Sequence, residues 1–297
     1  MLVGVLAIFL APFPMYWFVY GRHLGGGGRG IATSAFVCLV CQIIACYVIG
    51  AILILLGYGH RNVRRWARTL SLTLLYVWLV LGLPLTLLFF YVLFWFVVAI
   101  VGILLGLLVL PCALLVWLVL PRTLIQFYES RDVVLTFETK DPNTYWTEKV
   151  PLPILVLTSL LLFYVMVLPL PMMLNGVFAF FGVLLSGYRG ILAHNVLILC
   201  FIALAWGTFR QRKWAWWGAV ICFTGLLLSS VLTFPRLSYA EILNNMAVFP
   251  SEAEHLQRIP FHGIHFAVLV GVPFIATLRK IIVSREHFGI GSAAHER

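Results

Sequence analysis

Three histidines have the spacing and surroundings of cofactor ligands. His262 and His265 are three residues apart at the start of an apolar segment, so in a helix they share one face. His194 begins another apolar segment, next to Asn195. A neutral imidazole can ligate haem iron, copper or zinc, or hydrogen-bond a quinone. His194, His262 and His265 are therefore the candidate cofactor-binding residues. The same pattern also fits interfacial side chains that face headgroups and water, and the sequence requires no cofactor.

Other motifs point less clearly to chemistry. Cys38 and Cys41 form a CxxC pair, but they lie inside an apolar run, where cysteine is an ordinary small apolar residue. The glycine run at 25–28 lacks the Lys-Ser/Thr of a phosphate-binding loop and predicts a flexible turn. The sequence has no HExxH motif and no Ser-His-Asp pattern in a defined context. We therefore expect no metal site and name no catalytic residue.

Two clusters combine cations with indoles at expected helix ends. Indoles favour the headgroup level of a membrane, and cations near them attract lipid phosphate. We interpret the clusters as anchors, with a specific lipid site or a partner's acidic loop as alternatives. The predicted lipid and interface anchors are Arg64, Arg65, Trp66, Arg210, Arg212, Lys213, Trp214 and Trp217.

The elements that position these residues must lie in a membrane. The 297-residue chain is 63% hydrophobic and 10% charged, whereas a soluble domain carries about 25% charged residues. A soluble enzyme, a secreted disulfide scaffold and a disordered tail are excluded. The net charge of +10 lies in loops between apolar runs, so it indicates orientation and lipid attraction and not nucleic-acid binding. The predicted fold is an all-α polytopic helical bundle that forms one transmembrane domain over residues 1–297.

About 20 apolar residues make a spanning helix, and the runs allow eight or nine. The N-terminal run lacks a basic start and a cleavage site, so we take it as the first span. We expect spans at about 2–20, 31–57, two within 69–120 that turn near 94–99, one within 152–187, then 191–209, 214–233 and 262–283. Outside the spans, 121–151 predicts a cytoplasmic loop that forms a short β-hairpin or is irregular, and 234–261 predicts an outer loop with an interfacial helix near 237–247.

The segment 152–187 decides the topology. One crossing, with a broken or re-entrant element near 169–187, places 15 of the 20 Lys and Arg residues on one side and 5 on the other. Two crossings give an 11-to-9 split. The positive-inside rule favours the first. We therefore expect eight spans with both termini cytoplasmic, in a bacterial inner membrane by default.

The sequence leaves three functions open. All ten acidic residues lie in loops or the tail, and no clear repeat relates the two halves. This pattern favours a non-catalytic accessory, scaffold or assembly subunit, whose partners are membrane lipids and other membrane-protein subunits. A permease for a small or lipid-like substrate is the first alternative, because prolines interrupt the run near 169–175. A membrane-embedded redox or lipid enzyme that uses the outer histidines is the second.

Overall fold

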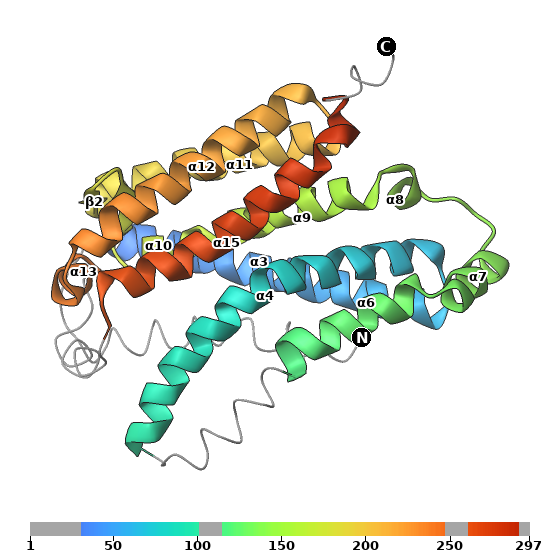
Figure 1. The fold of residues 1–297 in the computed structure, drawn as a ribbon, viewed down its shortest axis with the longest axis horizontal. Coiled ribbons are helices and arrows are strands. Elements are labelled where there is room, and N and C mark those ends of the chain that lie inside the picture. Colours follow the sequence, from blue (N-terminus) through green and yellow to red (C-terminus); the bar gives the residue numbers. More distant parts are fainter. Residues whose placement is uncertain (1–30, 101–114, 247–260, 291–297) are drawn as a thin grey trace.

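The computed structural model of the chain describes residues 31–100, 115–246 and 261–290, which form a bundle of long helices (Figure 1). Five described helices are long and apolar enough to cross a membrane: Ile43–Arg61, Leu152–Met172, Gly187–Phe209, Lys213–Arg236 and Gly263–Phe288. The predicted all-α membrane bundle is thus supported. The predicted count of eight spans is not established, and the span expected at 2–20 lies outside the described residues.

The first half of the chain begins with two long helices joined by a tight turn. These are α3 (Ile31–Arg61) and α4 (Arg65–Ile100). The turn predicted near 94–99 is wrong, because α4 continues through Ile100. The next described element is a π-helical turn, η1 (Leu115–Val119), which packs against α4. An uninterrupted apolar helix carries no local signal for its end, so the run could not fix the turn.

Residues 120–149 form helices, and the β-hairpin predicted within 121–151 is wrong. The elements are α6 (Leu120–Glu129), α7 (Arg131–Lys140) and α8 (Trp146–Lys149). The Thr136 hydroxyl donates to the Asp132 carbonyl over 2.7 Å, so this β-branched residue is satisfied in a helix. Phe137 is buried, with its ring edge toward the His60 ring at 5.9 Å. An isolated hairpin would have had no sheet to join, whereas α7 has a packing partner.

The segment 152–187 contains one candidate span followed by a β-hairpin. Helices α9 (Leu152–Val167) and α10 (Pro169–Met173) continue each other and end at one end of the bundle. Strands β1 (Phe178–Phe180) and β2 (Val183–Leu185) then pair antiparallel, with Phe178 opposite Leu185. The segment therefore holds one candidate crossing, as predicted, but a hairpin replaces the expected re-entrant element.

The hairpin rests on a helix through its own backbone. The amide of Phe181 donates to Ser229 Oγ over 2.9 Å, and that of Gly182 donates to Thr233 Oγ1 over 2.8 Å. Phe181 and Gly182 have φ of 40° and 93°, as a two-residue primed turn requires. Both turn amides thus have hydroxyl partners on the helix Lys213–Thr233.

The second half of the chain supplies the remaining helices, whose bounds lie close to the predicted spans. They are α11 (Gly187–Phe209), α12 (Lys213–Thr233), η2 (Phe234–Arg236), α13 (Tyr239–Asn245), α15 (Gly263–Val283) and η3 (Ser284–Phe288). Helix α13 falls where an interfacial helix was expected. A reciprocal cap between Ser238 and Glu241 starts it, and hydrogen bonds from Ser238 lower the pKa of the Glu241 carboxyl.

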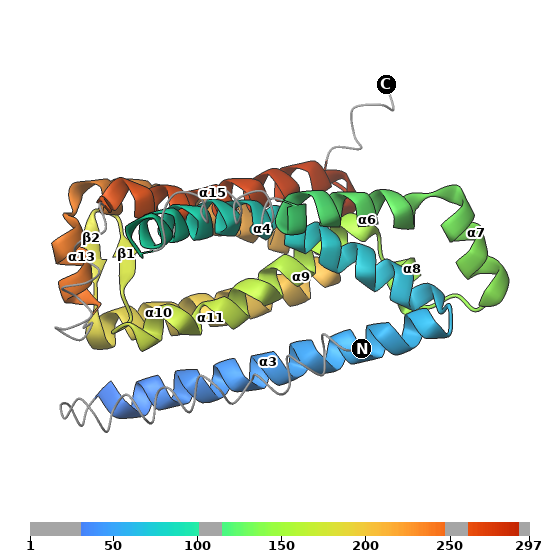
Figure 2. The same cartoon turned by 90° about the horizontal axis from the view of Figure 1, so that it is seen from below.

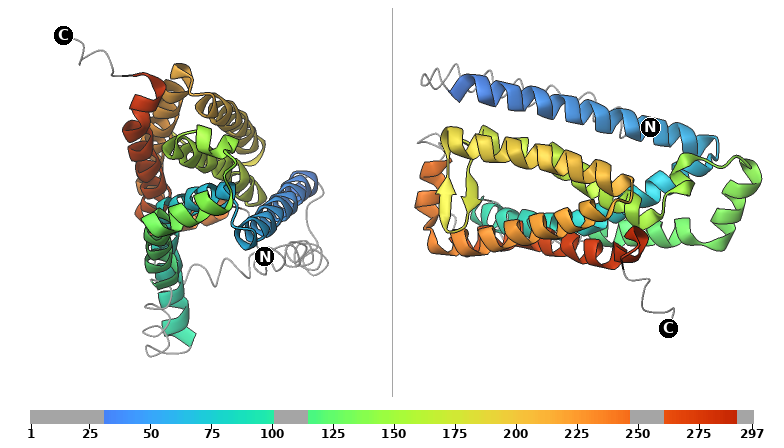
Figure 3. Two further views of the ribbon diagram at one scale, coloured as in Figure 1. Left: turned by 90° about the vertical axis from the view of Figure 1, so that its right-hand side faces the viewer. Right: turned by 90° about the horizontal axis from the view of Figure 1, so that it is seen from above.

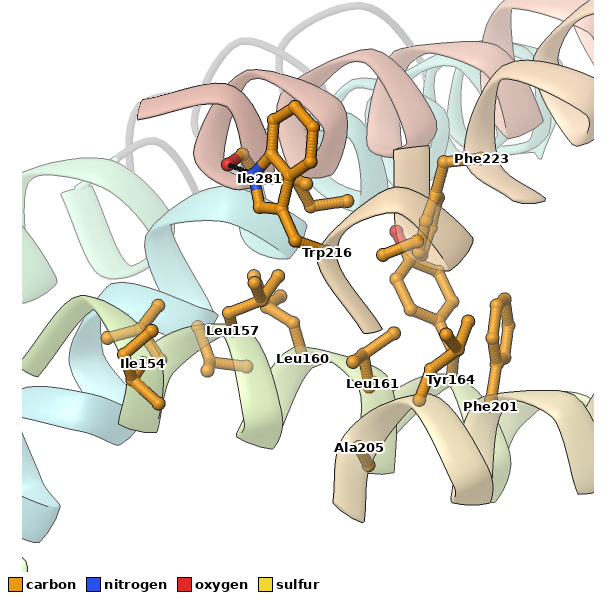
Figure 4. Close-up of a cluster of buried hydrophobic side chains, with 14 of the residues drawn as sticks. Ile154, Leu157, Leu160, Leu161, Tyr164, Phe201, Ala205, Trp216, Phe223 and Ile281 are labelled. Carbon is orange, nitrogen blue, oxygen red and sulfur yellow. Dashed lines mark hydrogen bonds between the residues drawn. The ribbon is translucent and has the colours of Figure 1, made fainter. Parts of the chain in front are cut away.

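The main core lies between α4, α9, α11, α12 and α15 (Figure 4). The buried Tyr164 ring is 5.7 Å from Phe201 and 5.3 Å from Phe223, between ring centroids. Its hydroxyl hydrogen-bonds with Thr277 Oγ1 over 2.9 Å. Trp216 Nε1 donates to the Ile281 carbonyl over 2.8 Å, which ties α12 to α15. Such pairing is required inside a bilayer, where water cannot satisfy polar groups.

The loops and turns gather at two ends of the bundle (Figure 2, Figure 3). One end carries the α3–α4 turn, the segment from α7 to α8 and the α11–α12 turn; we call it the basic end. The opposite end carries the hairpin and α13. The loops that charge counting assigned to one side of the membrane thus lie together.

Candidate functional site

His194, a predicted cofactor ligand, lies inside the bundle. It is only 2% exposed, and its Nδ1 donates to the Gly190 carbonyl over 2.8 Å. The Phe178 ring stands edge-on to the imidazole at 5.1 Å. A Cβ at Gly190 would collide with the Gly176 carbonyl, so this crossing is tight. In this structure His194 packs the hairpin end against α11.

His262 and His265 lie together at the start of α15. The backbone amide of His262 donates to His265 Nδ1 over 2.9 Å, and the two rings are 5.6 Å apart. This bond caps the helix and occupies one ring nitrogen of His265. Among the described residues, no three His, Cys, Asp or Glu side chains gather as a metal site would require. The three histidines therefore do not assemble into one ligand set.

The predicted anchors lie in two helical corners at the basic end. The first corner joins α3 to α4 at 58–67, and the second joins α11 to α12 at 206–215. Every position of the second corner follows its counterpart by 148 residues, and Gly59, Arg64, Trp66 and Ala67 recur as Gly207, Arg212, Trp214 and Ala215. Arg65 is matched by Lys213. The expectation that no repeat relates the halves is thus wrong at this motif.

The backbone of the two corners is the same. In the first, the amide of Arg64 donates to the Gly59 carbonyl over 2.8 Å; in the second, that of Arg212 donates to Gly207 over 2.9 Å. The residue before each arginine, Val63 or Gln211, has a positive φ of 49° or 53°. This pattern is a Schellman cap, which closes a helix with one left-handed residue.

Each corner also closes on its glycine. A Cβ at Gly59 would lie 2.6 Å from Ala67 Cβ and 2.9 Å from the Trp66 ring. A Cβ at Gly207 would lie 2.6 Å from the Trp214 ring and 2.7 Å from Ala215 Cβ. The glycine, tryptophan and alanine therefore form one packing unit that sets the angle between successive helices. Without the structure, the spacing of these residues around two arginines was the only available signal.

Acidic residues fill the first corner. Arg65 Nε donates to Glu148 Oε1 over 2.9 Å, and Arg64 Nη1 lies 3.5 Å from Asp141 Oδ1. Arg65 Nη2 lies 3.6 Å from Glu138 Oε1. Burial alone would raise the pKa of Asp141. Hydrogen bonds from the Tyr145 side chain and the Arg65 amide, and the charge of Arg64, together lower it. Asp141 thus caps the first turn of α4 with a charged group.

A further polar contact joins α3 to α4 beside this corner. His60 Nε2 lies 2.7 Å from Ser71 Oγ, and the Tyr128 ring stacks on the imidazole at 5.3 Å. Neither His60 nor Ser71 was a sequence candidate, because they lie eleven residues apart in no recognised motif. The pair has the distance that a base and a nucleophile need.

In the second corner the cations point outward. Arg210, Arg212 and Lys213 are exposed, and within 4.0 Å of them no carboxylate lies among the described residues. Arg210 stacks over the Trp206 ring at 5.0 Å, while Trp214 and Trp217 are 51% and 55% exposed. The anchors therefore divide into an internally paired set and an outward-facing set.

Comparison of the chain with protein-family models, curated proteins and solved structures finds no match. The internal repeat and the contacts above are therefore the basis for a function.

Proposed function

We propose that the protein is a non-catalytic accessory or scaffold subunit of a larger membrane complex. The observation that carries this proposal is a helical platform, α6 to α8, which packs against α4 and whose α7 projects beyond the α3–α4 turn at the basic end (Figure 1). A projecting element that is locked to the bundle has the properties of a docking surface. The basic end would face the cytoplasm of a bacterial inner membrane, by the positive-inside rule.

Several contacts lock this platform. Arg68 Nε donates to the Tyr128 carbonyl over 2.8 Å, and the Tyr76 hydroxyl donates to Glu129 Oε1 over 2.7 Å. Together with the buried Asp141, these bonds join α4 to all parts of the platform. A surface with fixed geometry loses little entropy on binding, which suits a permanent partner.

Large apolar side chains lie on the outside of the platform. Phe127, Leu135 and Trp146 are 57%, 46% and 56% exposed. Leu135 shares α7 with exposed charged residues such as Asp132 and Glu138, so this surface is mixed, unlike that of a lipid-facing helix. Aromatic and aliphatic anchors within a polar rim are typical of protein interfaces.

The permease alternative has less support. Transporter sites at broken helices lie near the bilayer midplane. Here α10 lies toward the hairpin end of the bundle, where it packs against α3 and α11 (Figure 2). Its Pro169 and Pro171 therefore bend the chain after most of the span is complete.

The enzyme alternative has one specific observation in its favour, the contact between His60 and Ser71. Hydrolysis of a lipid ester by purified protein, abolished by Ser71→Ala, would favour it. We instead expect Ser71→Ala to cost about 1 kcal/mol of stability, as the loss of one interhelical hydrogen bond does. Circular dichroism during heating would measure that cost.

Gentle detergent extraction followed by light scattering tests the subunit proposal. We expect a protein mass well above the 33.5 kDa of the chain. Leu135→Glu should release the partner, because it places a charge in the docking surface. Asn244→Glu adds the same charge at an exposed polar position of α13, at the opposite end of the bundle, and should leave the assembly intact. A monomeric wild-type protein in native-lipid particles would overturn the proposal.

A further inference from the structure

The second corner repeats the first in backbone and packing but lacks its acidic filling. Within the first corner, Arg64 and Arg65 meet Asp141 and Glu148. The acids come from a segment that follows α7, turns, and forms the single turn of α8. The first corner thus shows which ligand a corner of this type binds within the chain. That ligand is two carboxylates, seven residues apart, on a short irregular segment.

The cations of the second corner begin from equivalent backbone positions. Arg212 and Lys213 stand at the same places in the cap as Arg64 and Arg65, and the same four backbone hydrogen bonds fix them, at 2.8–3.1 Å in each corner. The side chains of Arg212 and Lys213 are exposed; of their counterparts, Arg64 is 45% exposed beside its acid and Arg65 is 21% exposed. Two adjacent cations on a rigid turn, with no carboxylate within 4.0 Å among the described residues, are electrostatically complementary to a pair of carboxylates.

The neighbourhood of the second corner favours a protein ligand. Trp146 of α8 contacts Phe209 at 6.0 Å between ring centroids, so the platform borders this corner. Phe209 lies three residues before Arg212, so a partner docked on the platform would border the second corner. Exposed Trp214 and Trp217 offer apolar contact area beside the charges.

We infer that the second corner binds an acidic segment of a partner subunit, with one carboxylate on Arg212 and another on Lys213. This inference rests on the proposed scaffold function and names the chemistry of the partner. The partner's acidic segment would carry two acidic residues separated by a turn, as the stretch from Asp141 to Glu148 does in the first corner. An anionic phospholipid is the competing ligand, and the test separates the two.

Zero-length crosslinking in native membranes tests the inference. A water-soluble carbodiimide activates a carboxylate as an O-acylisourea. The Lys213 amine attacks the acyl carbon, an amide forms, and the urea leaves with the carboxylate oxygen. We expect mass spectrometry to find Lys213 joined to an Asp or Glu of another polypeptide. Lys213→Arg keeps the charge but cannot form the amide, so the partner should copurify without the crosslink.

Charge reversal gives an independent readout. Arg212→Glu with Lys213→Glu should reduce the copurified partner by about tenfold or more, since like charges then meet. Arg279→Glu with Arg285→Glu makes the same change in net charge at exposed positions of the same end, and it should leave the partner bound. Equal loss in both double variants would overturn the inference, because it would show a general charge effect.

The remaining outcomes distinguish failure of the site from failure of the function. A complex that persists after charge reversal, with no crosslink at Lys213, overturns the site but leaves the scaffold function. A crosslink from Lys213 to Glu286 of the same chain, or anionic phospholipid lost only from the reversed variant, also overturns the site. If no partner is found even in the wild-type protein, both proposals fail.

Discussion

The indole of Trp214 lies across Gly207, with its Cζ2 atom 2.6 Å from the place where a Cβ would stand. The turn between α11 and α12 can close only because residue 207 has no side chain. The same relationship holds between Trp66 and Gly59. The corners are therefore fixed by packing as well as by the hydrogen bonds of the cap.

Gly207→Ala should destabilise the protein by about 1–3 kcal/mol, because the new methyl group overpacks the corner. Gly225→Ala is the matched control: it lies in the same helix pair, and a Cβ there meets nothing within 4 Å. We expect that control to be neutral, or stabilising by up to about 1 kcal/mol. Thermal unfolding in detergent measures both. Equal midpoints would contradict the packing of Trp214 on Gly207.

Val63→Gly should stabilise the protein by about 1 kcal/mol. A β-branched residue at a φ of 49° is strained, and glycine accepts that conformation without cost. Gln211→Gly relieves less strain, because glutamine is unbranched at Cβ, so we expect only a few tenths of a kcal/mol. The same melting experiment compares them. A larger gain at 211 than at 63 would argue against the equivalence of the two turns.

Acid should loosen the platform through Asp141. The pKa of this carboxyl is lowered in the folded protein, so its charged form contributes stability above its unfolded pKa of about 4. That contribution is lost as the pH falls through the folded pKa, below about 4. Hydrogen exchange in α7 and α8 should rise in this range. Asp141→Asn should already exchange faster at neutral pH and show a smaller acid-induced change.

Cys200 and Cys222 should form a disulfide on oxidation with copper phenanthroline. The two thiols interact across α11 and α12, and their oxidation yields one S–S bond, two protons and two electrons passed to the oxidant. Mass spectrometry should show a peptide containing both residues, with Cys46 of α3 not joined to either. A link between Cys46 and Cys200 instead would contradict the packing of α11 on α12.

The sequence predicted the helices of the second half well and those of the first half less well. Runs such as 191–209 and 214–233 are bounded by charges and aromatic residues, so their ends are marked locally. The apolar stretch after Arg68 has no such marks, and the end of α4 could not be placed. Residues 133–139 favoured a strand by composition, but burial of Phe137 against His60 made them a helix.

The candidate site could be predicted only in part. The cation–indole clusters lie at helix ends, as expected, because charge next to tryptophan is a strong local signal. Which arginines are paired depends on Asp141 and Glu148, more than 70 residues away, and no local pattern shows this. The histidines were chosen for their chemistry. In the structure, the His194 ring donates a hydrogen bond to the Gly190 carbonyl of its own helix. The His265 ring accepts one from the His262 amide and so caps α15.

The hairpin also bears on how the protein tolerates different membranes. Its turn amides are bonded to Ser229 and Thr233, and Phe180, Phe181 and Val183 are 50–59% exposed. A turn that needs no water for these groups loses little when hydrocarbon covers it. We therefore expect the hairpin end to tolerate changes in bilayer thickness better than the basic end, where cations and indoles favour a fixed depth. When the lipid chain length changes, the depth of the hairpin end in the bilayer should change, and that of the basic end should not.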